Sequence, residues 1–284
     1  AERFYRKALE LVPDRLSVMN NLAAVLLHRR QYDEAKSWCE KVLSLTAADA
    51  DAILNLGNCH LALKSPAEAL KAFDNALAIN PGWAEAHVGR SAALIGLGRV
   101  EESLASCDQA LALNPDCAEA FNNRGNALHR VGRNLEALAS YDRAVAVKSD
   151  FAEAFYNRAN TLRDLRRNDD ALESVDVALR LSPDYVEALN CRAVVLRNLR
   201  RNDEAFACVE RALAIDPGYV EALHNNGNWL MMSERYAEAA EIFERLLHID
   251  PEWEYAPGQL IYCRAPMCDW RDSTPKAAEL TARV

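Results

Sequence analysis

The order of small, apolar and polar positions in this chain repeats every 34 residues from residue 1 to residue 253. One column of small residues holds Ala1, Ala35, Ala69, Ser103, Ala137, Ala171, Ala205 and Ala239. Another holds Ala23, Gly57, Ser91, Gly125, Ala159, Ala193 and Gly227. Small residues at fixed places let two helices cross closely. A constant period of this length is typical of stacked helix–turn–helix units. We therefore expect two helices in each unit.

Prolines mark the ends of these units at the same spacing: Pro13, Pro81, Pro115, Pro183, Pro217 and Pro251. Ala47 and Ser149 fill the two intervening places. Because proline cannot continue a helix, we expect each proline to end the second helix of a unit. Acidic residues then follow in the first turn of most first helices, where the helix dipole favours them: Asp51, Glu85, Glu119, Glu153, Glu187 and Glu221.

This pattern resembles the tetratricopeptide repeat (TPR) family, whose loose motif is W-x2-L-G-x2-Y…A-x3-F…P. Repeat 50–83 carries Gly57, Ala69, Phe73, Ala76 and Pro81 at the matching places. The resemblance implies an all-α fold, a right-handed superhelical solenoid of antiparallel helix pairs. We place seven full repeats at 16–49, 50–83, 84–117, 118–151, 152–185, 186–219 and 220–253. Residues 1–15 are expected to be the second helix of a truncated repeat, and 254–284 a C-terminal helical segment leading toward a missing catalytic domain.

Asparagines recur at the sixth and ninth positions of the repeats, three residues apart and so on one helical face. They are Asn21, Asn55, Asn58, Asn123, Asn126, Asn157, Asn160, Asn225 and Asn228. In the TPR family the first helix of each pair lines the concave groove. A primary amide can pair with both the N–H and the C=O of an extended peptide, so we predict that these nine residues bind peptide. The alternative is that asparagine is merely tolerated on a wet helix surface. Gly89 and Cys191 interrupt the row.

Arginine also recurs, at the seventh position: Arg90, Arg124, Arg158 and Arg192. The twenty-fifth position is acidic in every full repeat: Glu40, Asp74, Asp108, Asp142, Asp176, Glu210 and Glu244. We expect ion pairs within or between repeats, a structural rather than a ligand-binding role.

The overall charge limits the classes of partner. Lys and Arg total 33 against 42 Asp and Glu, a net charge of −9, which argues against binding to nucleic acid or to anionic membranes. No apolar run is long enough to span a bilayer. The eight cysteines include no C-x-x-C pair, so we expect reduced core thiols and a cytoplasmic location. The histidines lack ligand spacing and no P-loop or nucleophile motif occurs. We therefore predict no catalytic residue, cofactor or metal.

The repeat pattern stops near residue 254, and the run Cys268-Asp269-Trp270-Arg271-Asp272 follows. This run, together with Asn-rich first helices such as 121–127, resembles O-linked N-acetylglucosamine transferase-like (SPINDLY-type) proteins. The resemblance implies a non-catalytic TPR arm that recruits polypeptide substrates to a glycosyltransferase domain. A structural or oligomerisation module without a transferase is the alternative. A chaperone adaptor is disfavoured, because the second position is mainly acidic where such an adaptor needs a basic clamp.

We also expect the two ends of the repeat array to be incompletely covered. In residues 4–12, the apolar residues Tyr5, Ala8, Leu9 and Val12 lie at helical spacing with no first-helix partner. At the other end, we expect Trp253, Leu260, Ile261 and Trp270 to meet a following domain. Solenoids normally seal their ends with polar caps. We therefore predict self-association through an exposed end.

Overall fold

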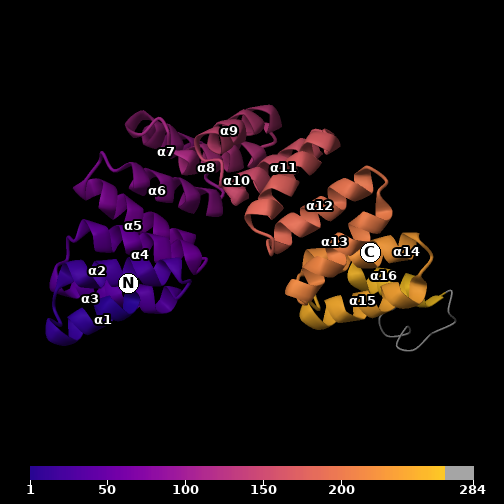
Figure 1. Ribbon diagram of the computed structural model, residues 1–284, viewed down its shortest axis with the longest axis horizontal. Coiled ribbons are helices and arrows are strands. Elements are labelled where there is room, and N and C mark those ends of the chain that lie inside the picture. The colour runs from indigo at the N-terminus through magenta and orange to yellow at the C-terminus, as the bar shows by residue number, and fades with distance from the viewer. Residues whose placement is uncertain (266–284) are drawn as a thin grey trace, which may run out of the picture. The chain divides into compact units, whose positions relative to one another are not determined.

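Sixteen α-helices and no strand make up residues 1–265, the part of the chain that this computed structural model describes (Figure 1). The chain divides into two compact units, Ala1–Asp150 and the part from Phe151 onward. The first unit contains α1 (Glu2–Leu11), α2 (Leu16–His28), α3 (Tyr32–Leu45), α4 (Ala50–Ala62), α5 (Pro66–Ile79), α6 (Ala84–Gly96), α7 (Val100–Leu113), α8 (Ala118–Arg130) and α9 (Asn134–Val147). The second contains α10 (Ala152–Asp164), α11 (Asn168–Leu181), α12 (Val186–Asn198), α13 (Asn202–Ile215), α14 (Val220–Met232), α15 (Tyr236–Ile249) and α16 (Ala256–Arg264).

The expected all-α solenoid of antiparallel helix pairs is confirmed. Each even-numbered helix from α2 to α14 is the first helix of a pair and packs on the helix that follows it. Within each unit, consecutive first helices also pack closely on each other, whereas no described second helix packs closely on another second helix of its unit. The first helices therefore form the tighter, inner row of each unit, and the second helices form the outer row.

The turns between pairs are built as the prolines predict. The second helices α5, α7, α11, α13 and α15 each end two residues before a proline. The side chain before the proline closes the turn: Asn80 Oδ1 accepts from the backbone N–H of Gly82 at 3.1 Å. Asp216 Oδ1 accepts in the same way from Gly218 at 2.9 Å. These Asx turns explain why Asn or Asp precedes most of the prolines.

The shorter turn inside each pair depends on one residue in the left-handed backbone region. Gly98 and Gly132 occupy this place with φ of 73° and 75°. The remaining five pairs use residues with a side chain at φ between 56° and 63°: Arg30, Lys64, Arg166, Arg200 and Glu234. A Cβ is disfavoured in this region, so these five turns are strained relative to the two glycine turns.

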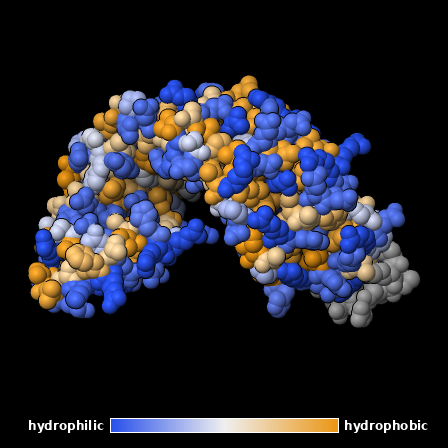
Figure 2. Space-filling view, viewed as in Figure 1, coloured by the Kyte–Doolittle hydropathy of each residue, from blue (hydrophilic) through white to orange (hydrophobic). Residues whose placement is uncertain are grey.

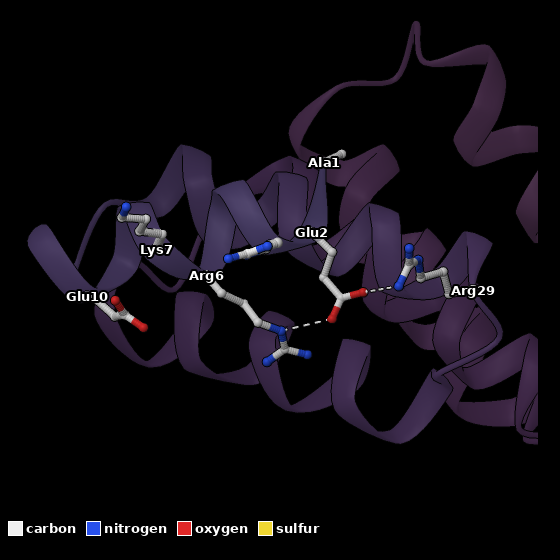
Figure 3. A pocket seen from close by; sticks show the side chains of 7 residues that line it. Ala1, Glu2, Arg6, Lys7, Glu10 and Arg29 are labelled. Carbon is white, nitrogen blue, oxygen red and sulfur yellow. Dashed lines mark hydrogen bonds and ion pairs between the residues drawn. The ribbon is translucent and has the colours of Figure 1, made fainter.

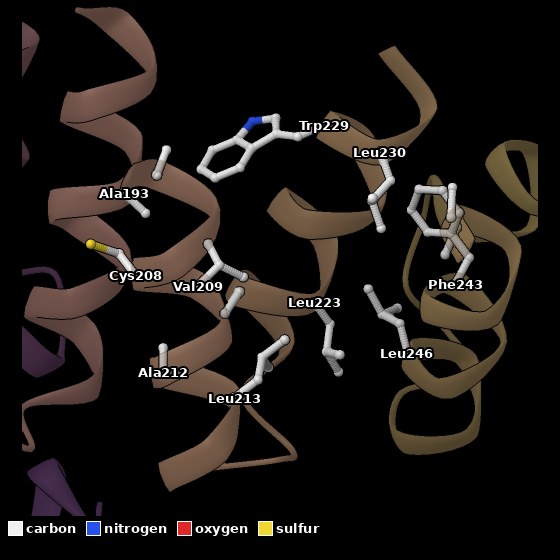
Figure 4. Packing of buried hydrophobic residues seen from close by; sticks show 14 of the residues in the cluster. Ala193, Cys208, Val209, Ala212, Leu213, Leu223, Trp229, Leu230, Phe243 and Leu246 are labelled. Carbon is white, nitrogen blue, oxygen red and sulfur yellow. The ribbon is translucent and has the colours of Figure 1, made fainter. Parts of the chain in front are cut away.

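Small residues on the first helices face larger ones on the second helices, as the columns predicted. A Cβ on Gly57 would lie 2.7 Å from Cε1 of the buried Phe73, and one on Gly227 would lie 2.7 Å from Cε1 of Phe243. The largest core cluster belongs to the second unit and extends from Leu189 to Cys263 (Figure 4). In Figure 4, Leu223 and Leu230 of α14 lie on one side of this cluster, and Phe243 and Leu246 of α15 lie on the other.

The described cysteines are free thiols, and all except Cys117 are buried. Burial raises the pKa of Cys107 to about 11 and that of Cys191 to about 12. These thiols are therefore protonated at neutral pH, in keeping with their expected role as small core residues.

The expectations for the two ends need correction. Leu9 is buried, and Tyr5 and Ala8 pack against the core formed by α2 and its neighbours, so they are not an uncovered stripe. Of the four predicted residues, Val12, just after the helix, is exposed as expected, and the exposed apolar residues of α1 itself are Phe4 and Leu11. At the other end, Leu260 is 4% exposed and Trp253 packs against the core of the second unit. Their apolar surface is covered by their own unit. Trp270 and the run at 268–272 lie outside the described residues.

Candidate functional site

The nine predicted asparagines all lie on first helices, the inner row of each unit. They fall on α2, α4 and α8 in the first unit and on α10 and α14 in the second. Asn21 is exposed and the other eight are half-buried. These amides therefore belong to the inner row of their own unit, the row that the sequence predicts to line a groove. We call them, with Gln259 described below, the amide row.

Asn123 and Asn126 on α8 divide their hydrogen-bonding capacity. Asn123 Nδ2 donates to the backbone carbonyl of Val88 at 3.1 Å and to Ser91 Oγ at 2.9 Å, which ties α8 to α6. Both of its donors are used within the protein, and its Oδ1 atom stays free to accept. Asn126 has the opposite state, because its Oδ1 accepts from the Tyr141 hydroxyl at 2.7 Å and its N–H groups stay free. Together the two residues offer one acceptor and one donor group, three positions apart.

Asn225 and Asn228 repeat this division on α14. Asn225 Nδ2 donates to Asn190 Oδ1 at 2.9 Å, again tying a first helix to the preceding one. Asn228 Oδ1 accepts from Gln259 Nε2 at 2.6 Å, and its Nδ2 atom lies 3.0 Å from His224 Nε2. Burial lowers the pKa of His224, so its ring is neutral and Nε2 accepts. The sixth position again presents an oxygen, and the ninth a remaining N–H.

The sequence pattern missed Gln259, which lies 34 residues after Asn225 and extends the amide row onto α16. Its Oε1 atom is buried without a hydrogen-bond partner, as is Nε1 of Trp253. The residue lies one full period past Asn225, but the proline and small-residue markers of the repeat end near residue 253, so its position in the period is its only sequence signal.

The gap in the amide row at Gly89 has a steric cause. A Cβ at Gly89 would lie 2.3 Å from Cε1 of Phe73, so the ring from the preceding second helix fills the space that an amide would need. Cys191, at the other gap, is buried. Asn55 and Asn58, on α4, have no side-chain hydrogen bond within the described part of the chain. They are open to a ligand at both donor and acceptor.

Aromatic residues flank the amide row in the second unit. The rings of Tyr156 and Tyr185 are 5.1 Å apart, and the amide of Asn160 is within hydrogen-bonding reach of the Tyr156 hydroxyl. Tyr219 reaches Asn190 in the same way. Burial, reinforced by nearby carboxylates such as Glu187, raises the pKa of Tyr185 and Tyr219. Both phenols therefore stay neutral and able to donate a hydrogen bond at physiological pH.

The recurring arginines make the structural contacts that the sequence predicted. Arg90 Nε donates to Asp74 at 2.7 Å, and Arg192 Nε donates to Asp176 at 2.7 Å. Arg124 lies 3.5 Å from Asp108. Each pair joins a first helix to the preceding second helix, so these arginines are part of the scaffold.

A pocket at the start of the chain is lined by basic residues whose charges are partly compensated by a carboxylate in the same pocket. Its lining includes Arg3, Arg6, Lys7 and Arg29. Arg6 and Arg29 point at Glu2 from opposite sides, at 2.9 Å and 2.6 Å (Figure 3). These hydrogen bonds lower the pKa of Glu2, whose charge compensates the guanidinium groups. The pocket therefore offers less positive charge than its composition indicates.

Hydrophilic and hydrophobic residues are interspersed over the visible face of each unit (Figure 2). Among residues 1–265, no group of three or more potential ligands could hold a metal ion. No described helix is both long enough and apolar enough to cross a bilayer.

Sequence models of one family match most of the chain, and all are described as tetratricopeptide repeat. They match residues 15–48, 50–82, 89–154, 156–220 and 199–257. A search of curated protein sequences finds no match.

Solved structures resemble the fold. In the Cut9–Hcn1 hetero-tetramer of APC/C, the similar chain is 15% identical with a TM-score of 0.79, over 92% of this chain and 52% of that one. This chain thus spans about half the length of that relative. TTC0263, a thermophilic TPR protein from Thermus thermophilus, is 24% identical with a TM-score of 0.58, over 65% of this chain and 99% of that one.

Proposed function

The chain belongs to the tetratricopeptide-repeat family, and from this premise we propose that it binds extended polypeptide along the amide row. Helix-pair scaffolds of this kind present surfaces for other proteins and carry no chemistry of their own. The proposed ligand is a main chain in extended conformation, held by hydrogen bonds from the first helices.

The observation that supports the proposal is that the two asparagines of a pair keep different groups free, one an acceptor and the other a donor. On α8, Asn123 keeps a free oxygen and Asn126 keeps free N–H groups. An extended peptide presents one N–H and one C=O at every residue, so the pair matches its main chain. An asparagine that was only tolerated at the surface would have no reason to be fixed in one orientation by a neighbouring helix.

Charge near the amide row favours neutral or basic segments. Glu187 and Glu221 are exposed in the first turns of α12 and α14, and neither forms an ion pair within the described residues. Carboxylates in these places would repel an acidic peptide and attract a basic one.

Alanine substitution at one asparagine pair tests the proposal. In a titration with an unstructured basic polypeptide, Asn123→Ala with Asn126→Ala should weaken binding, and Asn225→Ala with Asn228→Ala should do the same. Asn134→Ala, at the first residue of the second helix α9, is the matched control and should bind as the wild type does. Equal affinity of all variants, with unchanged helicity, would remove the support for binding at the amide row.

We further propose that the chain is the substrate-recruiting arm of a cytoplasmic O-linked N-acetylglucosamine transferase-like protein. The Cys268-Asp269-Trp270-Arg271-Asp272 run and the Asn-rich first helices support this assignment. The reading frame beyond Val284 tests it: a following glycosyltransferase domain is expected, and its absence would overturn the transferase link while leaving peptide binding intact.

A structural or oligomerisation module remains the second candidate, because α1 exposes apolar side chains. Phe4 is 74% exposed and Leu11 is 78% exposed, and burying such surface stabilises association. Sedimentation equilibrium of the wild type and of Phe4→Ser with Leu11→Ser separates the candidates. A dimer that dissociates in the variant supports self-association through α1, and a wild-type monomer at high concentration contradicts it.

A further inference from the structure

The seventh-position arginines show how this scaffold holds a guanidinium group between two second helices. Arg192 on α12 donates through Nε to Asp176 on α11 and through Nη1 to Cys208 on α13, at 2.7 Å and 2.9 Å. Arg90 on α6 makes the equivalent bonds to Asp74 and to Ser106, at 2.7 Å and 2.6 Å. Because these second helices do not pack closely on each other, the guanidinium bridges the space between them.

The next repeat keeps this space but lacks the arginine. Asn226 lies 34 residues after Arg192, Glu210 lies 34 after Asp176, and Ile242 lies 34 after Cys208. These three residues line one cavity of about 380 Å³. The cavity therefore occupies the place where the preceding repeat holds its own guanidinium.

Two polar groups in this cavity lack partners. Asn226 is only 8% exposed, lines the cavity, and has no side-chain hydrogen bond within the described residues. Glu210, which corresponds to the carboxylate that binds Arg192, has no ion pair within the same part of the chain. Neither group is saturated by the protein, so both are able to bond to a ligand that enters the cavity.

The remaining walls suit the rest of a cationic side chain. Carboxylates of Asp203 and Glu241 surround the opening, and Phe206, Leu230 and Ile242 provide apolar surface. Among the described residues of the wall the one cation is Arg235, which donates to both oxygens of Glu238, at 2.8 Å and 2.6 Å, and lies over the Phe206 ring. Its charge is already compensated, which leaves the cavity acidic.

We infer that this cavity, between α13 and α15 on the outer row of the second unit, binds an arginine side chain of a partner polypeptide. The guanidinium would donate to Glu210 and to the Asn226 oxygen, and its methylene groups would lie against Ile242 and Leu230. An arginine is favoured over a lysine because a planar, forked donor can reach both acceptors at once. This site is separate from the amide row, so a partner bound there could also be gripped at the groove.

The test uses the whole chain and a short neutral peptide with one central arginine. Chemical shifts of the Asn226 side-chain amide are followed by NMR as the peptide is added. The same peptide with citrulline, which keeps the shape and loses the charge, is the ligand control. The arginine peptide should shift the Asn226 signal saturably and bind about tenfold more tightly than the citrulline peptide.

Two variants locate the site. Glu210→Gln should weaken binding of the arginine peptide about tenfold, whereas Glu173→Gln, an exposed change on α11, should have no effect. Asn226→Arg should fill the cavity with a guanidinium group of the chain itself, and so abolish peptide binding. It should also raise the midpoint temperature of thermal unfolding. That increase should disappear when Asn226→Arg is combined with Glu210→Gln.

Three outcomes would overturn the inference: equal binding of the arginine and citrulline peptides, full binding by Glu210→Gln, or occupation of the cavity by a second copy of the chain, seen as an Asn226 shift that depends on protein concentration alone. This test does not involve the amide row, so a negative result would not affect the proposal that the amide row binds peptide.

Discussion

Seven side-chain pairs, each sixteen residues apart, couple the first helix of a repeat to its second helix. Where the second helix carries an aromatic residue, as at Phe73, Tyr141 and Phe243, the first helix carries glycine. Where it carries cysteine or valine, the first helix carries alanine or serine: Ala23–Cys39, Ser91–Cys107, Ala159–Val175 and Ala193–Val209. A larger residue on the second helix is thus offset in part by a smaller one on the first, as dense core packing requires.

This coupling predicts a strong effect of a single methyl group. A Cβ at Gly125 would lie 2.5 Å from Cε1 of Tyr141, so Gly125→Ala should lower the free energy of unfolding by about 1–3 kcal/mol through overpacking. Combining it with Tyr141→Val, which recreates the Ala159–Val175 pair, should cost less than the sum of the two single changes. Urea denaturation of the four proteins measures the coupling, and additive costs would show that the two positions are independent.

The strained turns within the helix pairs lead to a second prediction. Arg200 is exposed and has a φ of 62°, a backbone conformation that glycine adopts without a steric penalty. Arg200→Gly should therefore raise the free energy of unfolding, by about 0.5–1 kcal/mol once the added flexibility of the unfolded chain is included. Gly132→Ala is the reverse change at the equivalent turn and should destabilise. Thermal denaturation checks both, and a loss of stability in Arg200→Gly would contradict the account of these turns.

Neighbouring helices are tied together by charge as well as by packing. The pair between Arg192 and Asp176 is partly exposed, so its contribution is modest despite good geometry. Asp176→Asn should lower stability by about 0.5–1 kcal/mol at low salt, and the loss should shrink at high salt as the charges are screened. Glu173→Gln, on the same helix α11, provides the control. A loss that does not change with salt would mean that hydrogen-bond geometry rather than charge is responsible.

The helices could be predicted from sequence because their determinants are local and periodic. Prolines, small columns and first-turn carboxylates mark the boundaries of helices, and the structure places them as expected. The state of each amide could not be predicted in this way. Whether Asn123 has free donors depends on Val88 and Ser91 in the preceding repeat, and the gap at Gly89 depends on the ring of Phe73. Both features depend on contacts between neighbouring repeats, and the recurrence of one residue type at one position gives no information about such contacts.

Within each unit, each described helix packs only on helices close to it in sequence. Stability is then a sum of neighbouring interfaces, and a helix with one close neighbour should open first. Helix α1 packs closely on α2 alone, so its amides should exchange with solvent faster than those of α8, which packs on α6, α7 and α9. Hydrogen exchange resolved by residue tests this, and equal protection of α1 and α8 would indicate cooperative unfolding of the whole first unit.

The amide row is proposed to hold the main chain of a peptide and not its side chains. The most direct measurement compares, by calorimetric titration, one unstructured basic peptide with a copy that is N-methylated at alternate residues. Methylation removes the N–H groups that would donate to Asn123 and Asn225 and leaves every side chain in place. We expect the methylated peptide to lose most of its affinity for the wild type, and Asn123→Ala with Asn225→Ala to bind both peptides equally weakly. Equal, tight binding of the two peptides by the wild type would contradict the account.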